Sequence, residues 1–73
     1  MSVLNVKCYS GYKADEKPLS FILDGKKLLI AKIFNQWRSP GLNYFKVLAD
    51  DGKTYLLKNY YQEGEWALEK IFE

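Results

Sequence analysis

The chain has 73 residues, of which 48% are hydrophobic and 27% are charged, and its formal net charge is +2. This composition is typical of one small folded domain spanning residues 1–73, and it excludes a disordered chain. The longest apolar run, residues 28–31, is far shorter than the roughly 20 residues of a membrane-spanning helix, and the small net charge does not by itself indicate a polyanionic partner.

Histidine is absent and cysteine occurs once, as Cys8. Without an imidazole there is no side chain that titrates near neutral pH as a general base, and no Cys–His or Ser–His–Asp group. A single cysteine forms no internal disulfide and is too few soft ligands for a transition-metal site. We therefore expect a protein that is not an enzyme and that uses no cofactor or metal. Because the first residues lack the basic segment and apolar run of a secretion signal, we expect it to be cytoplasmic.

The first strand is predicted over residues 3–9, where apolar and polar residues alternate. The residues that share its apolar face are Leu4, Val6 and Cys8. Residues 10–11, Ser-Gly, interrupt the strand, and the polar stretch 13–18 predicts a loop. Residues 15–16 begin at most a single helical turn, because Pro18 would end it.

The pair Asp24-Gly25 predicts a β-hairpin with a two-residue turn. Pairing across this turn sets Phe21 opposite Leu28 and Leu19 opposite Ile30. We expect five apolar residues on one face of this hairpin: Leu19, Phe21, Leu23, Leu28 and Ile30.

The strand that follows changes phase. Beyond residues 31–32 the apolar pattern shifts by one residue, to Ile33 and then to Trp37. A shift of one residue predicts a β-bulge, which bends a strand at the corner of a barrel. Residues 38–41, Arg-Ser-Pro-Gly, predict a turn after it.

A second hairpin surrounds the turn residues 50–52, Asp-Asp-Gly. A two-residue loop would set Phe45 opposite Lys58, whereas a three-residue loop with a left-handed glycine sets it opposite Leu57. We predict the three-residue loop, because it gathers apolar side chains on one face. Those side chains are Phe45, Val47, Ala49, Tyr55 and Leu57.

The last segment follows a turn predicted at residues 62–64. Residues 66–72 fit a strand, although their Ala, Leu, Glu and Lys content also suits a helix, and we favour the strand. The predicted fold is all-β: a small antiparallel meander of five to six strands, curled into an SH3-like barrel or half-barrel.

Several short motifs in this pattern resemble a family of short uncharacterised bacterial all-β proteins. They are Glu16-Lys17-Pro18-Leu19-Ser20-Phe21, Asp24-Gly25-Lys26-Lys27, Trp37, Tyr44-Phe45-Lys46-Val47, Asp50-Asp51-Gly52-Lys53-Thr54-Tyr55 and Trp66-Ala67-Leu68-Glu69-Lys70-Ile71-Phe72. Residues 8–12, Cys-Tyr-Ser-Gly-Tyr, are similar to a subset of its members. The resemblance implies one compact all-β domain. Because the family has no established activity, it implies no catalytic residue.

The cysteine and the paired carboxylates, which could carry chemistry, both fit structural roles. Cys8 has the same phase as Leu4 and Val6, so we expect a small core residue rather than a catalytic thiol. The paired carboxylates at residues 15–16, 50–51 and 63/65 lie in predicted turns, where such side chains satisfy the turn backbone. The glycines occur singly, so no phosphate-binding loop is indicated.

The outer face of the second hairpin combines aromatic and basic side chains. In the three-residue register it presents Tyr44, Lys46, Leu48, Thr54, Leu56, Lys58 and Tyr60, with Tyr44 opposite Lys58. Trp37-Arg38 and Lys26-Lys27 extend this face only if folding brings them to it. Sheets that bind single-stranded nucleic acid combine such residues, but strand propensity and solvation of the face explain the same pattern.

The chain has more apolar residues than one small interior holds. Pairs such as Leu28-Leu29, Leu56-Leu57, Tyr60-Tyr61 and Ile71-Phe72 place apolar side chains on both faces of their strands. We expect some of Leu29, Leu48, Leu56, Tyr60 and Tyr61 to lie outside the core. Exposed apolar patches mark association surfaces. The favoured function is a protein-interaction module, including self-association, and the alternative is a small barrel that binds single-stranded nucleic acid. The predicted binding residues are Trp37, Tyr44, Lys46, Leu48, Leu56, Lys58 and Tyr60.

Overall fold

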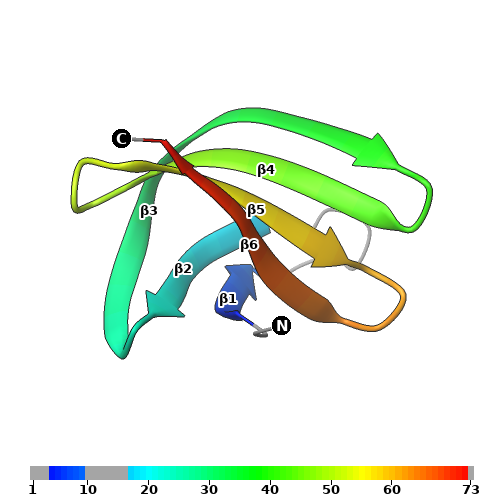
Figure 1. Ribbon diagram of the computed structural model, residues 1–73, viewed down its shortest axis with the longest axis horizontal. Coiled ribbons are helices and arrows are strands. Elements are labelled where there is room, and N and C mark those ends of the chain that lie inside the picture. The colour runs from blue at the N-terminus through cyan, green and yellow to red at the C-terminus, as the bar shows by residue number, and fades with distance from the viewer. Residues whose placement is uncertain (1–3, 10–16, 73) are drawn as a thin grey trace.

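Antiparallel strands make up the part of the chain that the computed structural model describes, residues 4–9 and 17–72. They are β1 (Asn5–Tyr9), β2 (Lys17–Leu23), β3 (Lys26–Ser39), β4 (Leu42–Ala49), β5 (Thr54–Tyr60) and β6 (Glu65–Phe72). Each strand pairs with its neighbours in chain order (Figure 1). The meander curls through 220° into a half-barrel, which confirms the predicted fold class.

The turn between β2 and β3 has the predicted two-residue form. Asp24 and Gly25 both have positive φ, 52° and 78°, as this class of hairpin turn requires. Asp24 tolerates this conformation better than most side chains do. Phe21 pairs with Leu28, so the register predicted from the turn is confirmed.

The turn between β4 and β5 spans three residues, as predicted. The Ala49 amide donates to the Lys53 carbonyl at 2.9 Å across it, and Gly52 adopts a φ of 85°. Phe45 therefore pairs with Leu57 in β5, as the three-residue loop requires.

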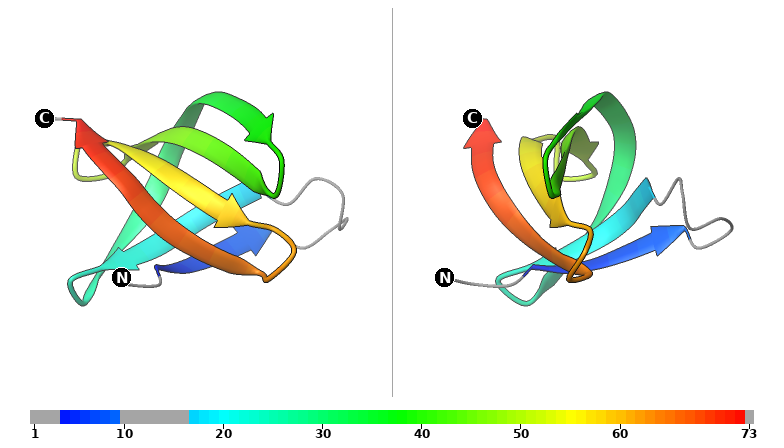
Figure 2. Two further views of the ribbon diagram at one scale, coloured as in Figure 1. Left: turned by 45° about the vertical axis from the view of Figure 1, so that its right-hand side comes forward. Right: turned by 90° about the vertical axis from the view of Figure 1, so that its right-hand side faces the viewer.

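β3 belongs to both halves of the barrel. It pairs with β2 over residues 26–29 and with β4 over residues 30–39. Its register with β4 shifts at Ala31 and again at Phe34, which are left out of the pairing. Bulges bend a strand, and Figure 2 shows β3 curving from the β1–β2 side toward β4. The bulge predicted beside residues 31–32 is confirmed and lies at Ala31, and the second one was not predicted.

The prediction that Leu19 lies in the core is wrong, because its side chain is 47% exposed. The register between β1 and β2 jumps from Lys7–Ser20 to Cys8–Pro18, so Leu19 is the extra residue of a bulge. Pro18, which pairs with Cys8, is buried instead. Simple alternation along β2 fails because the bulge changes the phase of the strand.

Two predicted strand boundaries are wrong, and the strand predicted for the last segment is confirmed. Lys17 and Pro18 belong to β2, not to the predicted loop, and β3 continues to Ser39, so the following turn is only Pro40-Gly41. Pro18 lies at the irregular end of the pairing with β1, where a missing amide is tolerated. Residues 65–72 form a strand, which confirms the choice of strand over helix.

The predictions for residues 10–16, namely the interruption, the loop and the helical turn, lie outside the described residues. Among residues 4–9 and 17–72 there is no helix with the length and apolar character needed to cross a membrane.

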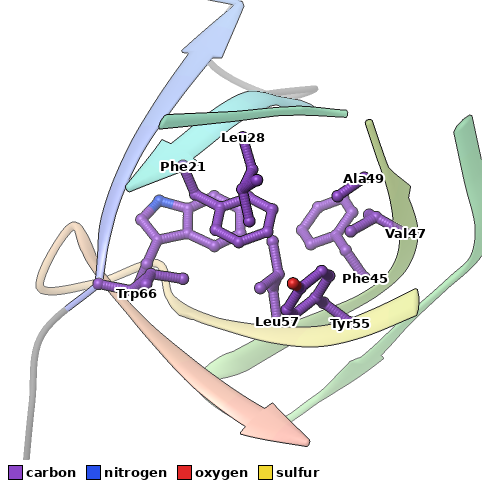
Figure 3. Close-up of a cluster of buried hydrophobic side chains, with 9 residues drawn as sticks. Phe21, Leu28, Phe45, Val47, Ala49, Tyr55, Leu57 and Trp66 are labelled. Atoms are coloured by element: carbon purple, nitrogen blue, oxygen red, sulfur yellow. The ribbon is translucent and has the colours of Figure 1, made fainter. Parts of the chain in front are cut away.

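The core fills the inside of the curl (Figure 3). The rings of Phe21 and Tyr55 meet edge to face with centroids 5.1 Å apart, and those of Phe45 and Trp66 lie 5.4 Å apart. The Leu4 amide donates to the Trp66 carbonyl at 2.8 Å and links the start of the chain to β6. The buried apolar residues are Leu4, Phe21, Leu28, Phe45, Val47, Ala49, Tyr55, Leu57, Trp66 and Ala67.

Candidate interaction surface

The outer face of β4 and β5 has the composition that the sequence predicts. Tyr44 pairs with Lys58, Lys46 with Leu56, and Leu48 with Thr54. Their inner neighbours Phe45, Val47, Tyr55 and Leu57 are buried, so the paired side chains point away from the core. We call the following set the aromatic face: Trp37, Tyr44, Lys46, Leu48, Leu56, Lys58 and Tyr60.

Trp37 joins this face through β3. It pairs with Tyr44 in β4, and the two rings stack with centroids 5.3 Å apart and planes only 12° apart. The Trp37 side chain nevertheless remains 42% exposed. Folding thus brings together two aromatic residues that the sequence analysis could not place side by side. Their stacked rings form a fixed aromatic platform on the surface.

β6 contributes residues that the sequence analysis missed. Phe72 pairs with Thr54, and Lys70 pairs with Leu56, so both extend the outer face beyond β5. The ammonium group of Lys46 lies over the Phe72 ring, 4.7 Å from its centroid, and that of Lys70 lies at 5.0 Å. These contacts are cation–π interactions. Alternation along the last strand does not predict them, because the register between β5 and β6 shifts beside Leu56.

The charge of Lys58 is partly balanced within the chain. Its Nζ lies 2.8 Å from Glu69 Oε1, and it also lies 5.6 Å from the centroid of the Tyr60 ring. The Glu69 carboxylate, followed by the Tyr60 hydroxyl, raises the pKa of Lys58 above its usual value. Lys58 therefore stays cationic, with an acidic neighbour already in place.

Other predicted surface residues divide into two groups. Leu29 and Tyr61 are exposed, as expected for part of the apolar surplus, whereas Leu48, Leu56 and Tyr60 are half-buried. The sequence analysis did not single out two further exposed residues, Ile22 and Phe34. Lys26 and Lys27 pair with Leu23 and Ile22 in the first hairpin, so they do not join the aromatic face through the β4–β5 ladder.

The chemically active residues have structural surroundings. Cys8 is half-buried and packs against the core with Val6, as its phase predicts. In the β4–β5 turn, Asp51 Oδ1 accepts from the Lys53 amide at 2.9 Å, and Asp51 Oδ2 accepts from the Tyr55 hydroxyl at 2.5 Å. The hydroxyl, followed by that amide, lowers the pKa of Asp51. Across the described ranges, no group of three or more carboxylate or thiol side chains has an arrangement that would hold a metal.

Comparison of the chain with protein-family models, curated proteins and solved structures found no match. The family resemblance expected from the sequence motifs therefore stays a prediction. The fold and the surface residues are the basis for a functional proposal.

Proposed function

We propose that this chain is a non-catalytic interaction module that binds a protein, either a different chain or a second copy of itself, through the aromatic face. The observation that supports this function best is the exposed stack of Trp37 on Tyr44. The few residues that dominate the binding energy of protein interfaces are enriched in tryptophan, tyrosine and arginine. Side chains that are already held in place lose little conformational freedom when a partner binds.

The surroundings of this stack favour a protein over a nucleic acid. Lys46 already contacts Phe72, and Lys58 is paired with Glu69. Binding of a single strand would require these cations to reach phosphates, and the Glu69 carboxylate opposes that. Leu48, two residues from Lys46 in β4, and Leu56, the partner of Lys46 in β5, suit apolar contacts with protein side chains.

The test compares three purified proteins: the natural chain, Trp37→Ala and Leu19→Ala. Leu19 is the matched control, because it is also a large exposed apolar residue but lies on β2. Light scattering after size exclusion gives the mass of each, and immobilised samples capture proteins from a cell lysate. We expect a dimer or a captured protein with the natural chain and with Leu19→Ala, and loss of either with Trp37→Ala.

Salt dependence separates this proposal from the alternative. An apolar protein interface changes little with added salt, whereas release of counterions makes nucleic-acid binding weaken steeply. Titration with single-stranded DNA at two salt concentrations measures this difference. The proposal is wrong if Trp37→Ala keeps every association of the natural chain. It is also wrong if the only Trp37-dependent ligand is DNA bound in a salt-sensitive way.

A further inference from the structure

A second surface lies on the outer side of the first three strands. In the ladders, Lys7 of β1 pairs with Ser20 of β2, which pairs with Leu29 of β3. The next outward row is formed by Asn5, Ile22 and Lys27. Phe21, between the two rows in β2, points into the core. We call these outward residues the basic face: Asn5, Lys7, Ser20, Ile22, Lys27 and Leu29.

This face is hollowed at its centre. A concavity of 280 Å³ is lined by Asn5, Val6, Lys7, Ser20, Phe21, Ile22 and Lys27. Ser20 is only 5% exposed, whereas Ile22 and Leu29 beside it are about half exposed. The hollow forms because a short serine side chain lies among longer neighbours. Its volume is smaller than that of most small-molecule sites, and it suits one or two side chains of a docked segment.

The charge around the hollow is unbalanced. Residues 4–9 and 17–30 contain four lysines but a single carboxylate, Asp24 in the turn. Within the described part of the chain, neither Lys7 nor Lys27 has an ion-pair partner. By contrast, Lys58 on the other half of the barrel is paired with Glu69. Among the described residues, the basic face therefore combines exposed aliphatic side chains with lysines that have no ion-pair partner.

We propose that the basic face docks an acidic segment of a partner protein, with carboxylates that pair with Lys7 and Lys27 and an aliphatic side chain that enters the hollow over Ser20. Charge complementarity makes a second copy of this surface an unfavourable partner, because it would place lysine against lysine. The exposed apolar side chains here are aliphatic, Ile22 and Leu29. Recognition of single-stranded nucleic acid relies instead on aromatic stacking. This site is separate from the aromatic face and does not depend on it.

The probe is a fluorescein-labelled peptide of alternating glutamate and leucine, titrated with the full chain and followed by fluorescence anisotropy. Peptides of alternating lysine and leucine, and of glutamate alone, test the acidic and the apolar contributions. We expect the glutamate–leucine peptide to bind most tightly and to shift amide resonances of β1, β2 and residues 26–29 in NMR spectra. Trp37→Ala should bind this peptide as the natural chain does.

Charge-reversal variants test the residues. The double variant Lys7→Glu/Lys27→Glu should weaken peptide binding by about ten-fold or more, since like charges then face each other. The matched control Lys32→Glu/Lys53→Glu changes the net charge equally on the other half of the barrel, and it should bind nearly as well as the natural chain. Ser20→Leu fills the hollow and should weaken binding while its circular dichroism stays unchanged. If Ser20→Leu does not fold, the comparison of Lys7→Glu/Lys27→Glu with Lys32→Glu/Lys53→Glu still tests the proposal.

Three results would overturn the proposal. The first is no binding of the glutamate–leucine peptide at millimolar concentration. The second is equal loss in the two double variants, which would indicate an effect of net charge alone. The third is tighter binding of single-stranded DNA than of the peptide with the same dependence on Lys7 and Lys27, which would assign the face to nucleic acid.

Discussion

Asn43 and Asn59 lie directly opposite each other in the β4–β5 ladder, and each has a buried Oδ1 with no hydrogen-bond partner among the described residues. They continue a row across the concave side of the sheet, between Arg38 of β3 and Trp66 of β6. In the next row along, Phe45 of β4 and Leu57 of β5 are both apolar and completely buried. The polar pair therefore marks one end of the hydrophobic core.

Replacement of Asn59 by leucine should stabilise the fold. Asn59 is 3% exposed, so its Oδ1 loses its water without gaining a partner. An unsatisfied buried polar group costs about 1–3 kcal/mol, and an apolar side chain of similar size removes that cost. We expect Asn59→Leu to raise the free energy of unfolding by about 1 kcal/mol, measured by urea denaturation. A loss of stability would contradict this and would show that the amide makes a contact that the fold needs.

The turns made much of the fold predictable from the sequence. Asp24-Gly25 and residues 50–52 permit few backbone conformations, and each turn sets the register of its hairpin. Once those registers are set, a period of two assigns inner residues such as Phe45 and Leu57 correctly. The predicted outer face of β4 and β5, including the Tyr44–Lys58 pair, follows from the same argument.

The β-bulges explain why alternation along the strands did not predict the whole register. A bulge adds one residue to one strand, and nothing in alternation alone says which residue is extra. The prediction for Leu19 is wrong for this reason. The pairing of Trp37 with Tyr44 could not be predicted either, because it depends on the second bulge, at Phe34. The register of β6 shifts beside Leu56, so the contact between Lys46 and Phe72 was equally hidden.

Truncation of a fully buried core residue should remove a large share of the stability of the fold. Phe45 is completely buried and packs against Trp66. Phe45→Ala typically costs about 3–5 kcal/mol, against a total of roughly 4–11 kcal/mol expected for a chain of this length. Far-ultraviolet circular dichroism during thermal unfolding measures the loss. The control Leu29→Ala, at a side chain that is 52% exposed, should change stability by less than about 0.5 kcal/mol. Similar melting curves for both variants would contradict the assigned core.

Substitution of Gly52 tests the three-residue loop. Its φ of 85° is a conformation that side chains other than glycine rarely adopt, although a Cβ atom there would meet nothing within 4 Å. The cost of Gly52→Ala is therefore backbone strain alone, about 1 kcal/mol. Gly52→Asn should lose less, because asparagine tolerates left-handed backbone. Urea midpoints measure the order glycine, asparagine, alanine, and an alanine variant as stable as the natural chain would contradict the loop geometry.

The bond between Tyr55 and Asp51 makes the stability of the β4–β5 turn depend on pH. The Tyr55 hydroxyl, more than the Lys53 amide, lowers the pKa of Asp51 in the folded chain. In the unfolded chain the carboxyl has its usual pKa of about 4. Folding thus favours the ionised form, so this contribution to stability is complete above about pH 4 and is lost as the pH falls through the folded-state pKa.

Asp51→Asn removes this contribution and should therefore lower the urea midpoint at pH 7. The difference from the natural chain should shrink as the pH falls through the folded-state pKa of Asp51, because the natural carboxyl is then protonated as well. Asp50→Asn is the matched control, because it removes the same charge one residue earlier in the turn, whereas Tyr55 bonds to Asp51. Its effect on the midpoint should be smaller at pH 7. If Asp51→Asn lowers the midpoint equally at all pH values, the ionised carboxylate does not stabilise the turn.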